Sequence, residues 1–426
     1  MEKNIGFVSF RIAGTDGVSL EVKKWAEIFE RNNCRCFYFA EELDTPPERS
    51  YYSKYAHFKN PVIAEINQRI YGTSKRDPDL TAKIHHYRKR IKEELHEFVN
   101  KFSIDVLIPQ NAVTIPLNIS LALALTEFIA ETEIKTIAHH HDFFWERKRF
   151  LRNSVWDYFN MAYPPHLPSI EHVVINSSGQ NQLALRTGIS STLIPNVMNF
   201  EKPAPGKDEY NADILEALGV SEDEILILQP TRVVQRKGIE HAIELVSRLG
   251  EKAVLVISHA SGDEGHEYEN RVHEYAKLMG IKAIFVSDII DDKREIRNGK
   301  KIYTLQDIYP YADFVTYPSL IEGFGNAFLE TIYFRKPILV NNYSIYSTDI
   351  KPKGFDVIEM DDFITDETVA QVKEVLNNPE RRKKMVEKNY KIAQCFYSYA
   401  VLEERLWDMM TTFWGVKQSC QGLNSD

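Results

Sequence analysis

Two glutamates, Glu322 and Glu330, lie eight residues apart and frame a glycine-rich turn in the segment Tyr317-Pro-Ser-Leu-Ile-Glu-Gly-Phe-Gly-Asn-Ala-Phe-Leu-Glu330. The apolar patterns on either side predict a short buried strand before the turn and a helix after it. Gly323 and Gly325 allow a sharp turn and a close approach of the backbone to a ligand. The N–H groups at the helix start can receive a phosphate, and the carboxylates can hold hydroxyl groups of a sugar and a ribose. The alternative is an ordinary strand-to-helix junction with solvated glutamates.

A second charged loop, Gln229-Pro-Thr-Arg-Val-Val-Gln-Arg-Lys-Gly238, follows one expected strand and precedes an expected helix. Arg232 can make paired hydrogen bonds to a diphosphate, and Lys237 can act on it as a point charge. Arg236 is a competing cation. Lys237 is preferred because it directly precedes the glycine at which the helix is expected to begin. The alternative is a solvated basic loop.

Three adjacent histidines, His139, His140 and His141, follow the expected strand 135–138 and precede Asp142. Neighbouring side chains in a strand-end loop diverge, whereas a zinc site needs separated ligands that converge on the ion. The pattern therefore predicts no metal site.

Three arginines, Arg11, Arg147 and Arg149, are expected on loops at one edge of the first sheet. Such arginines can bind the carboxylate or phosphate of an acceptor substrate. Solvated arginines are the alternative. A turn, Gly14-Thr-Asp-Gly17, follows the first expected strand and can approach a bound phosphate.

Two successive series of alternating strands and helices position these loops. The first opens with a strand at 5–10 and is interrupted by a charged, Pro- and Tyr-rich insertion at 41–76. Three prolines and a glycine in 194–206 mark a crossing, after which a second series begins at Ile225. Each series predicts a doubly wound parallel sheet, with ligands at the carboxyl ends of the strands. We expect domains at 1–198 and 199–396, and an amphipathic C-terminal helix.

Taken in order, the motifs resemble those of the retaining, nucleotide-sugar-dependent glycosyltransferases of family 4, in the glycogen-synthase-like and mannosyltransferase superfamily. The Glu322 to Glu330 segment resembles their Glu-x7-Glu signature, and Arg232 to Gly238 resembles their Gly-Arg…Lys-Gly segment, with Thr231 in place of the usual glycine. The resemblance implies a GT-B fold: an α/β architecture of two Rossmann-like domains, a cleft between them, and a C-terminal helix at 397–416 that crosses back to the first domain. A dimer helix is the alternative for that helix.

The resemblance also implies roles for individual residues. Arg232 and Lys237 would stabilise the leaving diphosphate, and Glu322 would orient the donor sugar. Glu330 would bind the ribose, and His141, or alternatively His140, would contact a sugar hydroxyl. The catalytic set is then Arg232, Lys237, Glu322 and His141; the donor-binding set is Gly17, Gly323, Phe324, Gly325, Asn326 and Glu330; and the acceptor-binding set is Arg11, His140, Arg147 and Arg149.

Of two further segments, the first matches the family less closely, and the second, at 286–288, resembles the segment that precedes the Glu motif in the family. The stretch 257–265 occupies the place of a glycine-rich loop, but His259 stands where a small residue is common. It would either line the cleft near the phosphates or, as we favour, only fill a turn. The strand end at 286–288 would face the nucleotide base through backbone groups.

Composition narrows the class of protein. A net charge of −9 over 426 residues argues against a nucleic-acid partner. The N-terminus reads as a strand rather than a signal peptide, no apolar run has transmembrane length, and four scattered cysteines indicate a reducing cytoplasm.

We therefore expect a cytoplasmic hexosyltransferase that uses a nucleoside-diphosphate sugar and needs no metal cofactor; a homodimer is possible. GDP-mannose and UDP-glucose both remain open as donors. The loop from His140 to Glu146 suggests enzymes that make solutes such as mannosylglucosylglycerate, with an anionic acceptor such as glucosylglycerate. The rival functions are a nucleotide-sugar epimerase or hydrolase of the same fold, and a non-catalytic nucleotide-binding protein.

Overall fold

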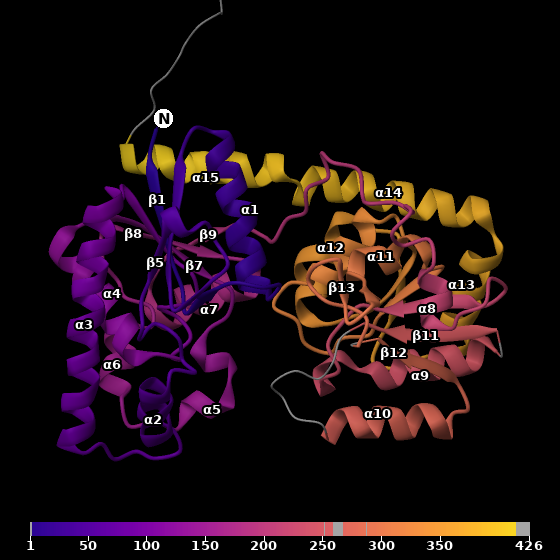
Figure 1. The fold of residues 1–426 in the computed structure, drawn as a ribbon, viewed down its shortest axis with the longest axis horizontal. Helices are drawn as coiled ribbons and strands as arrows, with labels where there is room; N and C mark the ends of the chain where they lie inside the picture. Colours follow the sequence, from indigo (N-terminus) through magenta and orange to yellow (C-terminus); the bar gives the residue numbers. More distant parts are fainter. Residues whose placement is uncertain (1, 251, 259–266, 287, 415–426) are drawn as a thin grey trace, which may run out of the picture. The chain divides into compact units, whose positions relative to one another are not determined.

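The chain forms two compact units, each built on one parallel sheet (Figure 1). The computed structural model describes residues 2–250, 252–258, 267–286 and 288–414. The first unit comprises the chain up to Pro195 together with the segment that begins at Tyr399, and the second comprises Asn196–Ser398. The sequence places the corresponding boundaries after residues 198 and 396.

The sheet of the first unit has the strand order β5-β3-β1-β6-β7-β8-β9, with every pair parallel. The strands are β1 (Asn4–Val8), β3 (Arg35–Ala40), β5 (Ser50–Tyr52), β6 (Val106–Pro109), β7 (Lys135–His140), β8 (Ile170–Val174) and β9 (Thr192–Leu193). The order runs outward in both directions from β1 and β6. This pair is therefore the switch point, beside which doubly wound sheets bind ligands.

Helices cover both faces of this sheet. They are α1 (Gly17–Arg31), α2 (Pro61–Ile70), α3 (Pro78–Phe102), α4 (Ile119–Thr132), α5 (Lys148–Leu151), α6 (Trp156–Ala162), α7 (Ser177–Thr187) and α15 (Tyr399–Trp414). α3 packs on α4, and α15 packs on α1, where Asn32 donates a 2.6 Å hydrogen bond to Glu403. The C-terminal helix thus belongs to the first unit.

The predicted insertion at 41–76 adds to the first unit rather than forming a separate domain. It contains β4 (Glu42–Leu43), which pairs with β2 (Arg11–Ile12), then β5 at the sheet edge, and α2. Apolar residues of α2, such as Ile63 and Ile66, join the core against α3 and α4.

The second sheet has the order β12-β11-β10-β15-β16-β17, again with every pair parallel. Its strands are β10 (Ile225–Gln229), β11 (Ala253–Ile257), β12 (Lys282–Phe285), β15 (Phe314–Tyr317), β16 (Ile338–Asn341) and β17 (Ile358–Met360). Its helices are α8 (Ile214–Leu218), α9 (Ile239–Leu249), α10 (Glu267–Leu278), α11 (Leu305–Ile308), α12 (Asn326–Tyr333), α13 (Asp366–Asn377) and α14 (Pro379–Tyr397). The predicted class of two doubly wound parallel-sheet domains is confirmed. The switch point of this sheet lies between β10 and β15.

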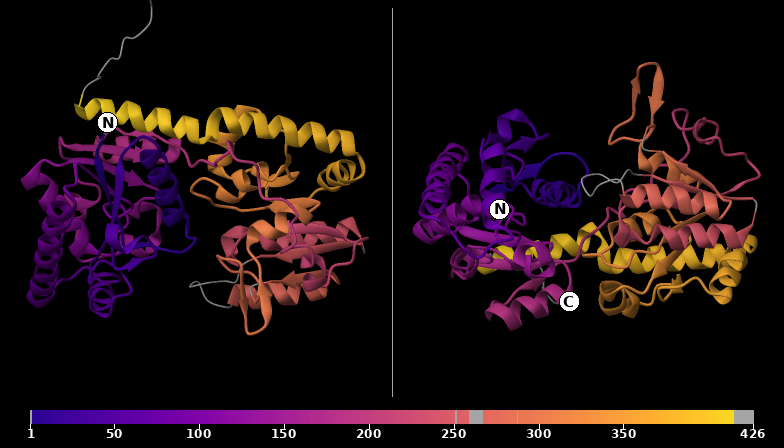
Figure 2. Two further views of the ribbon diagram at one scale, coloured as in Figure 1. Left: turned by 45° about the horizontal axis from the view of Figure 1, so that its top comes forward. Right: turned by 90° about the horizontal axis from the view of Figure 1, so that it is seen from below.

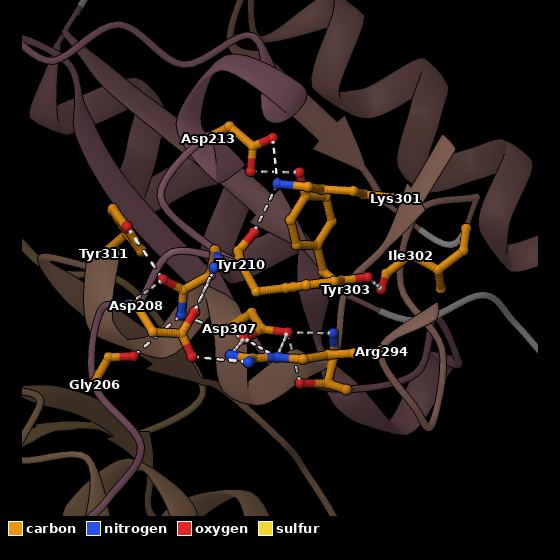
Figure 3. A network of polar contacts seen from close by, with 12 residues as sticks. Gly206, Asp208, Tyr210, Asp213, Arg294, Lys301, Ile302, Tyr303, Asp307 and Tyr311 are labelled. Atoms are coloured by element: carbon orange, nitrogen blue, oxygen red, sulfur yellow. Dashed lines mark hydrogen bonds and ion pairs between the residues drawn. The ribbon is translucent and has the colours of Figure 1, made fainter. Parts of the chain in front are cut away.

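An antiparallel hairpin, which the sequence reading missed, interrupts the second unit after β12. It consists of β13 (Glu295–Arg297) and β14 (Lys300–Ile302), and Figure 2 shows it standing away from the rest of that unit. Polar contacts hold its base (Figure 3). The Tyr210 hydroxyl lies 2.8 Å from the carbonyl oxygens of both Glu295 and Ile302, and Lys301 pairs with Asp213 at 2.8 Å.

The strongest contact of this network joins Arg294 to the buried carboxylate of Asp307 (Figure 3). Asp307 also accepts hydrogen bonds from the N–H and hydroxyl groups of Thr304, which cap α11. Burial alone would raise the pKa of Asp307, but Arg294 and the Thr304 donors outweigh it and leave the pKa below its ordinary value of 3.8. The hairpin is thus tied to the body of the unit by a buried, ionised carboxylate.

Replacing Arg294 with Ala should lower the free energy of unfolding of the second unit by about 2–3 kcal/mol at neutral pH, because Asp307 loses its charged partner. A native pKa below the unfolded value gives stability that is present above the unfolded pKa and lost as pH falls through the native one. The difference between wild type and variant, measured by denaturant unfolding, should therefore shrink in acid. The control is Arg297→Ala on the same hairpin, where Arg297 is 53% exposed and should cost about 0.5 kcal/mol or less. Equal losses in both variants would contradict the argument.

Candidate active site

The two charged loops of the second unit follow β10 and β15, the strands on either side of its switch point. Lys237, from the first loop, contacts Oε1 of Glu322, from the second. Arg236 approaches Oε2 of the same carboxylate at 3.4 Å. The topology therefore brings together two loops that are 85 residues apart in sequence.

The charged side chains of Lys237 and Glu322 are largely shielded from water. The side chains of Lys237 and Glu322 are 11% and 9% exposed. Burial alone would raise the pKa of Glu322, but Lys237 and then Arg236 outweigh it, and the pKa lies below its ordinary value. Burial lowers the pKa of Lys237, an effect that Glu322 opposes. The glutamate is ionised, and both of its oxygens already contact cations.

A glycine makes this close approach possible. Gly238 has a φ of +58°, and a Cβ atom built there would lie 2.5 Å from the carbonyl oxygen of Pro318 in the other loop. The N–H of Leu320 donates a 2.8 Å hydrogen bond to the carbonyl of Arg236, which joins the two backbones directly. Backbone contact, rather than side chains alone, therefore sets the distance between the loops.

Buried polar contacts orient the start of the first loop. Gln229 donates to the Thr231 hydroxyl at 2.8 Å and accepts from the Thr316 hydroxyl at 2.6 Å. Thr231, which departs from the family pattern, thus fixes the loop through its hydroxyl group. Arg232 follows it and is exposed, so its guanidinium is available to a ligand.

The second loop turns over two buried tyrosines. Gly325 has a φ of +134°, and a Cβ there would lie 2.6 Å from the Tyr343 hydroxyl, which donates to the Phe324 carbonyl at 2.8 Å. Lys237 Nζ lies 5.7 Å from the ring centroid of Tyr317. Tyr343 therefore restricts the turn at Gly325, and Tyr317 lies beside the Lys237 ammonium group.

Helix α12 begins at Asn326, where the sequence predicts a helix after the turn. The Asn326 side chain accepts a 2.7 Å hydrogen bond from Asn196. Glu330 lies in the last turn of α12, and its Oε2 atom accepts a 3.2 Å hydrogen bond from the buried Tyr309 hydroxyl. Gly323 is exposed and Phe324 is buried. Glu322 and Glu330 are thus held by different partners.

In the first unit, the loops after β6 and β7 converge on His141. Its Nε2 lies 3.0 Å from Gln110 Oε1, and its backbone N–H donates to Asn111 Oδ1 at 2.8 Å. With the amide oxygen of Gln110 facing the ring, the contact is a hydrogen bond when Nε2 carries the proton. Burial lowers the pKa of His141 to about 4, although Asp16 opposes the shift. At neutral pH this ring can hydrogen-bond a hydroxyl group but is a weak base.

The other two histidines differ from the loop placement expected from sequence. β7 extends to His140, so His139 and His140 lie in the strand and point to opposite faces. His139 stacks on Trp25 with ring centroids 4.3 Å apart, and His140 Nε2 lies 2.9 Å from His172 Nδ1. His140 is 1% exposed, so its predicted contact with the acceptor is not available in this structure.

The first βα turn carries a charged pair. Asp16 caps α1 by accepting from the N–H groups of Val18 and Ser19, and it contacts Arg11 at 3.1 Å. α1 begins at Gly17. Arg11 and Asp16 therefore lie together beside the switch point of the first sheet.

The two remaining arginines are placed differently from each other. Arg147 contacts Asp142, whose other oxygen accepts from Asn111 at 3.0 Å. Arg149 lies in α5 rather than on a loop, and its guanidinium carbon is 4.6 Å from the Phe150 ring centroid. The structure thus ties Arg147 to the His141 loop and places Arg149 against Phe150.

Several residues of these sites escaped the sequence reading. Gln110, Asn111 and Tyr343 lie directly after strands, and only the assembled sheet shows what they face. The sequence offers Arg236 as an alternative to Lys237, whereas in the structure both cations contact the carboxylate of Glu322. The segment around His259 lies outside the described residues.

The described part of the chain has no cluster of three or more His, Cys, Asp or Glu that would suit a metal ion, and no helix long and apolar enough to cross a membrane.

Comparison with known proteins identifies the family of this chain. The glycosyl transferases group 1 family matches residues 211–392, which contain both charged loops. The mannosylglucosylglycerate synthase of Petrotoga mobilis is 34% identical, over 84% of this chain and 86% of that protein. This chain belongs to the group 1 glycosyltransferases. The mannosylglucosylglycerate synthase of Thermotoga maritima is 30% identical over 94% and 98% of the two chains. The glycosyltransferase structure from Rickettsia africae, 15% identical, matches the fold with a TM-score of 0.69 over 96% and 98% of the two chains.

Replacing Gly238 with Ala should separate the two loops. A left-handed alanine costs about 1 kcal/mol, and the clash with Pro318 should add about 1–3 kcal/mol and reduce kcat/KM about 100-fold by displacing the cations. Gly280→Ala is the matched control, since Gly280 has a φ of +65° in the same unit but open space around it. It should show the backbone cost alone and keep full activity. Thermal unfolding and transfer kinetics of both variants test this, and equal activity would show that the close approach is not required.

Proposed function

We propose that this glycosyltransferase retains anomeric configuration and moves a hexose from a nucleoside-diphosphate sugar to a hydroxyl of a small anionic acceptor. The observation that carries the proposal is the cluster of Lys237, Arg236 and Glu322 at the switch point of the second sheet. Fixed cations at that position suit a departing diphosphate, because they stabilise the negative charge that develops on it. Arg232, exposed on the same loop, adds a third cation.

In this proposal Glu322 does not attack the sugar. Both of its oxygens contact cations, so it orients Lys237 and Arg236 and offers its remaining lone pairs to a donor-sugar hydroxyl. The first N–H groups of α12, with Gly323, Phe324, Gly325 and Asn326, bind the phosphates. Glu330 binds the ribose, and His141 donates to, or accepts from, a sugar hydroxyl as a neutral ring. The leaving phosphate takes the proton of the acceptor.

The acceptor side is proposed for the first unit. Arg11, in the short strand β2 that follows β1, and Arg147, on the loop after β7, supply positive charge there, while Gly14 and Gly17 allow the first turn to approach a ligand. Because two proteins that resemble this chain are named mannosylglucosylglycerate synthases, we propose GDP-mannose as donor and glucosylglycerate as acceptor. UDP-glucose is the second candidate donor. We further propose that the reaction takes place in the cytoplasm, which subcellular fractionation would test, and that the fixed cations make a divalent metal unnecessary.

Incubation of the purified chain with GDP-mannose, UDP-glucose or ADP-glucose, each with and without glucosylglycerate, should give transfer with one donor. Glucosylglycerol, which lacks the carboxylate, is the matched acceptor and should show a KM about tenfold higher or more. NMR of the product should show the anomeric configuration of the donor, and activity should survive EDTA. Release of nucleotide without acceptor would identify a hydrolase instead, formation of an epimer an epimerase, and binding without turnover a non-catalytic protein.

Replacing Lys237 with Met should reduce kcat by about 100-fold or more, because a cation that stabilises the leaving group is lost. It should also destabilise the second unit, since Glu322 stays buried with weaker compensation. The double variant Lys237→Met, Glu322→Gln removes both charges and should recover most of the stability but not the activity. Recovery of activity in the double variant would show that the pair only supports the fold.

A further inference from the structure

The first unit contains a pocket that none of the site residues above line. Its volume is about 330 Å³, and its lining includes Ser74, Leu151, Arg152, Ser154, Trp156 and Asp157. These residues come from the segment after α2 and from the corner between α5 and α6. The volume is at the lower end of the range for small-molecule sites, which is roughly 300–1,000 Å³.

Backbone pairing holds the two walls together. Tyr71 and Asn153 form an antiparallel bridge. The N–H of Gly72 donates to the Arg152 carbonyl at 2.9 Å, and the N–H of Ser154 donates to the Ile70 carbonyl at 3.1 Å. Asn153, which is buried and also lines the pocket, donates to the Phe150 carbonyl at 2.9 Å and accepts from the N–H of Val155 at 2.9 Å. The pocket is therefore built on a fixed backbone.

The polar groups of the pocket have unused capacity for hydrogen bonding. The Ser154 hydroxyl oxygen is buried and has no hydrogen-bond partner among the described residues. Arg152 is exposed. Its guanidinium forms no ion pair with any of the residues that the structure describes. Asp157, by contrast, is held by Arg76 through two hydrogen bonds of 2.8 and 2.7 Å. Arg76 and Asp157 neutralise each other, so Arg152 is left as the uncompensated positive charge.

An aromatic surface completes the pocket. The Trp156 side chain is a large apolar group that is 45% exposed. Edge contacts to Phe144 and Phe159, with ring centroids 6.0 and 5.5 Å apart, hold the indole in place. A fixed and exposed indole offers a flat apolar platform with a polar N–H, and the C–H face of a pyranose ring matches such a platform.

We propose that this pocket binds a hexose that carries a carboxylate or a phosphate. The sugar ring stacks on Trp156, Ser154 and Asp157 bond its hydroxyl groups, and Arg152 binds the anionic group. The ligand has the chemistry of the proposed acceptor, although Arg11 and Arg147, the acceptor residues of the proposed function, do not line this pocket. Binding of the acceptor here would be a second site for the same substrate, and that identity rests on the proposed function. Alternatively, the ligand is a separate effector of the same chemistry. The acceptor KM of a pocket variant distinguishes the two.

Calorimetric titration of the full chain with glucuronate, glucose 6-phosphate and methyl glucoside tests the proposal. At least one anionic sugar should bind about tenfold or more tightly than methyl glucoside. Arg152→Ala should remove that difference, and Trp156→Ala should abolish binding of all three probes. Lys89→Ala removes an exposed cation on α3 and serves as the control. It should change neither the preference for anionic sugars nor the binding of the three probes. Trp156→Phe should keep partial binding and the wild-type unfolding temperature, which separates loss of the platform from loss of the fold.

The titration does not depend on transfer activity. Binding should persist in Lys237→Met, because that variant alters only the donor loop. If Trp156→Ala raises the acceptor KM, the ligand is the acceptor; if it leaves kinetics unchanged, the ligand is a separate effector. Absence of saturable binding to the wild type, or binding that survives in both Arg152→Ala and Trp156→Ala, would overturn the proposal while leaving the proposed transferase reaction standing.

Discussion

The buried contact of Lys237 with Glu322, which the partly exposed Arg236 joins, is the interaction on which the candidate donor site depends. Removing two opposite charges from water costs several kcal/mol per ion before their attraction is counted. Such a contact is stable only if the backbone brings the partners together accurately. The strand order provides this, because β10 and β15 are neighbours whose following loops start side by side. Gly238 then permits the final approach, since any Cβ there would meet the Pro318 carbonyl.

The two units apply the same topology to different chemistry. In each sheet, the functional loops follow strands at or beside the switch point, as doubly wound folds require. The second unit places ionised groups there, which suits a ligand with fixed negative charge. At the corresponding edge the first unit combines a neutral histidine and two amides, Gln110 and Asn111, with two arginines paired to carboxylates. Neutral donors and acceptors suit hydroxyl groups, so the contrast is consistent with the proposed roles, in which the second unit binds the donor diphosphate and the first unit binds a polyhydroxylated substrate.

Much of the fold follows from local sequence because most elements carry their own signals. The alternation of apolar strands with amphipathic helices indicated both sheets, Gly323 and Gly325 marked a tight turn, and Gly238 marked the start of a helix. The hairpin β13–β14 carried no such signal. Its residues are charged and mostly exposed, and its stability comes from Tyr210, Asp213 and Asp307, which precede or follow it in the chain. Contacts of that kind cannot be deduced from local periodicity.

The histidines show the same limit within a site. Local sequence indicated that three neighbouring rings would diverge, but it could not show where β7 ends. Because the strand continues to His140, His139 and His140 are buried on opposite faces, and only His141 lies at the edge of the sheet. Burial then lowers the pKa of His141 to about 4, which makes the ring a poor proton acceptor at neutral pH. With Glu322 engaged by two cations and His141 neutral, neither residue is suited to act as nucleophile or strong base. In the proposed reaction, the remaining chemistry is stabilisation of a departing anion, and we assign that role to the cations of the β10 loop.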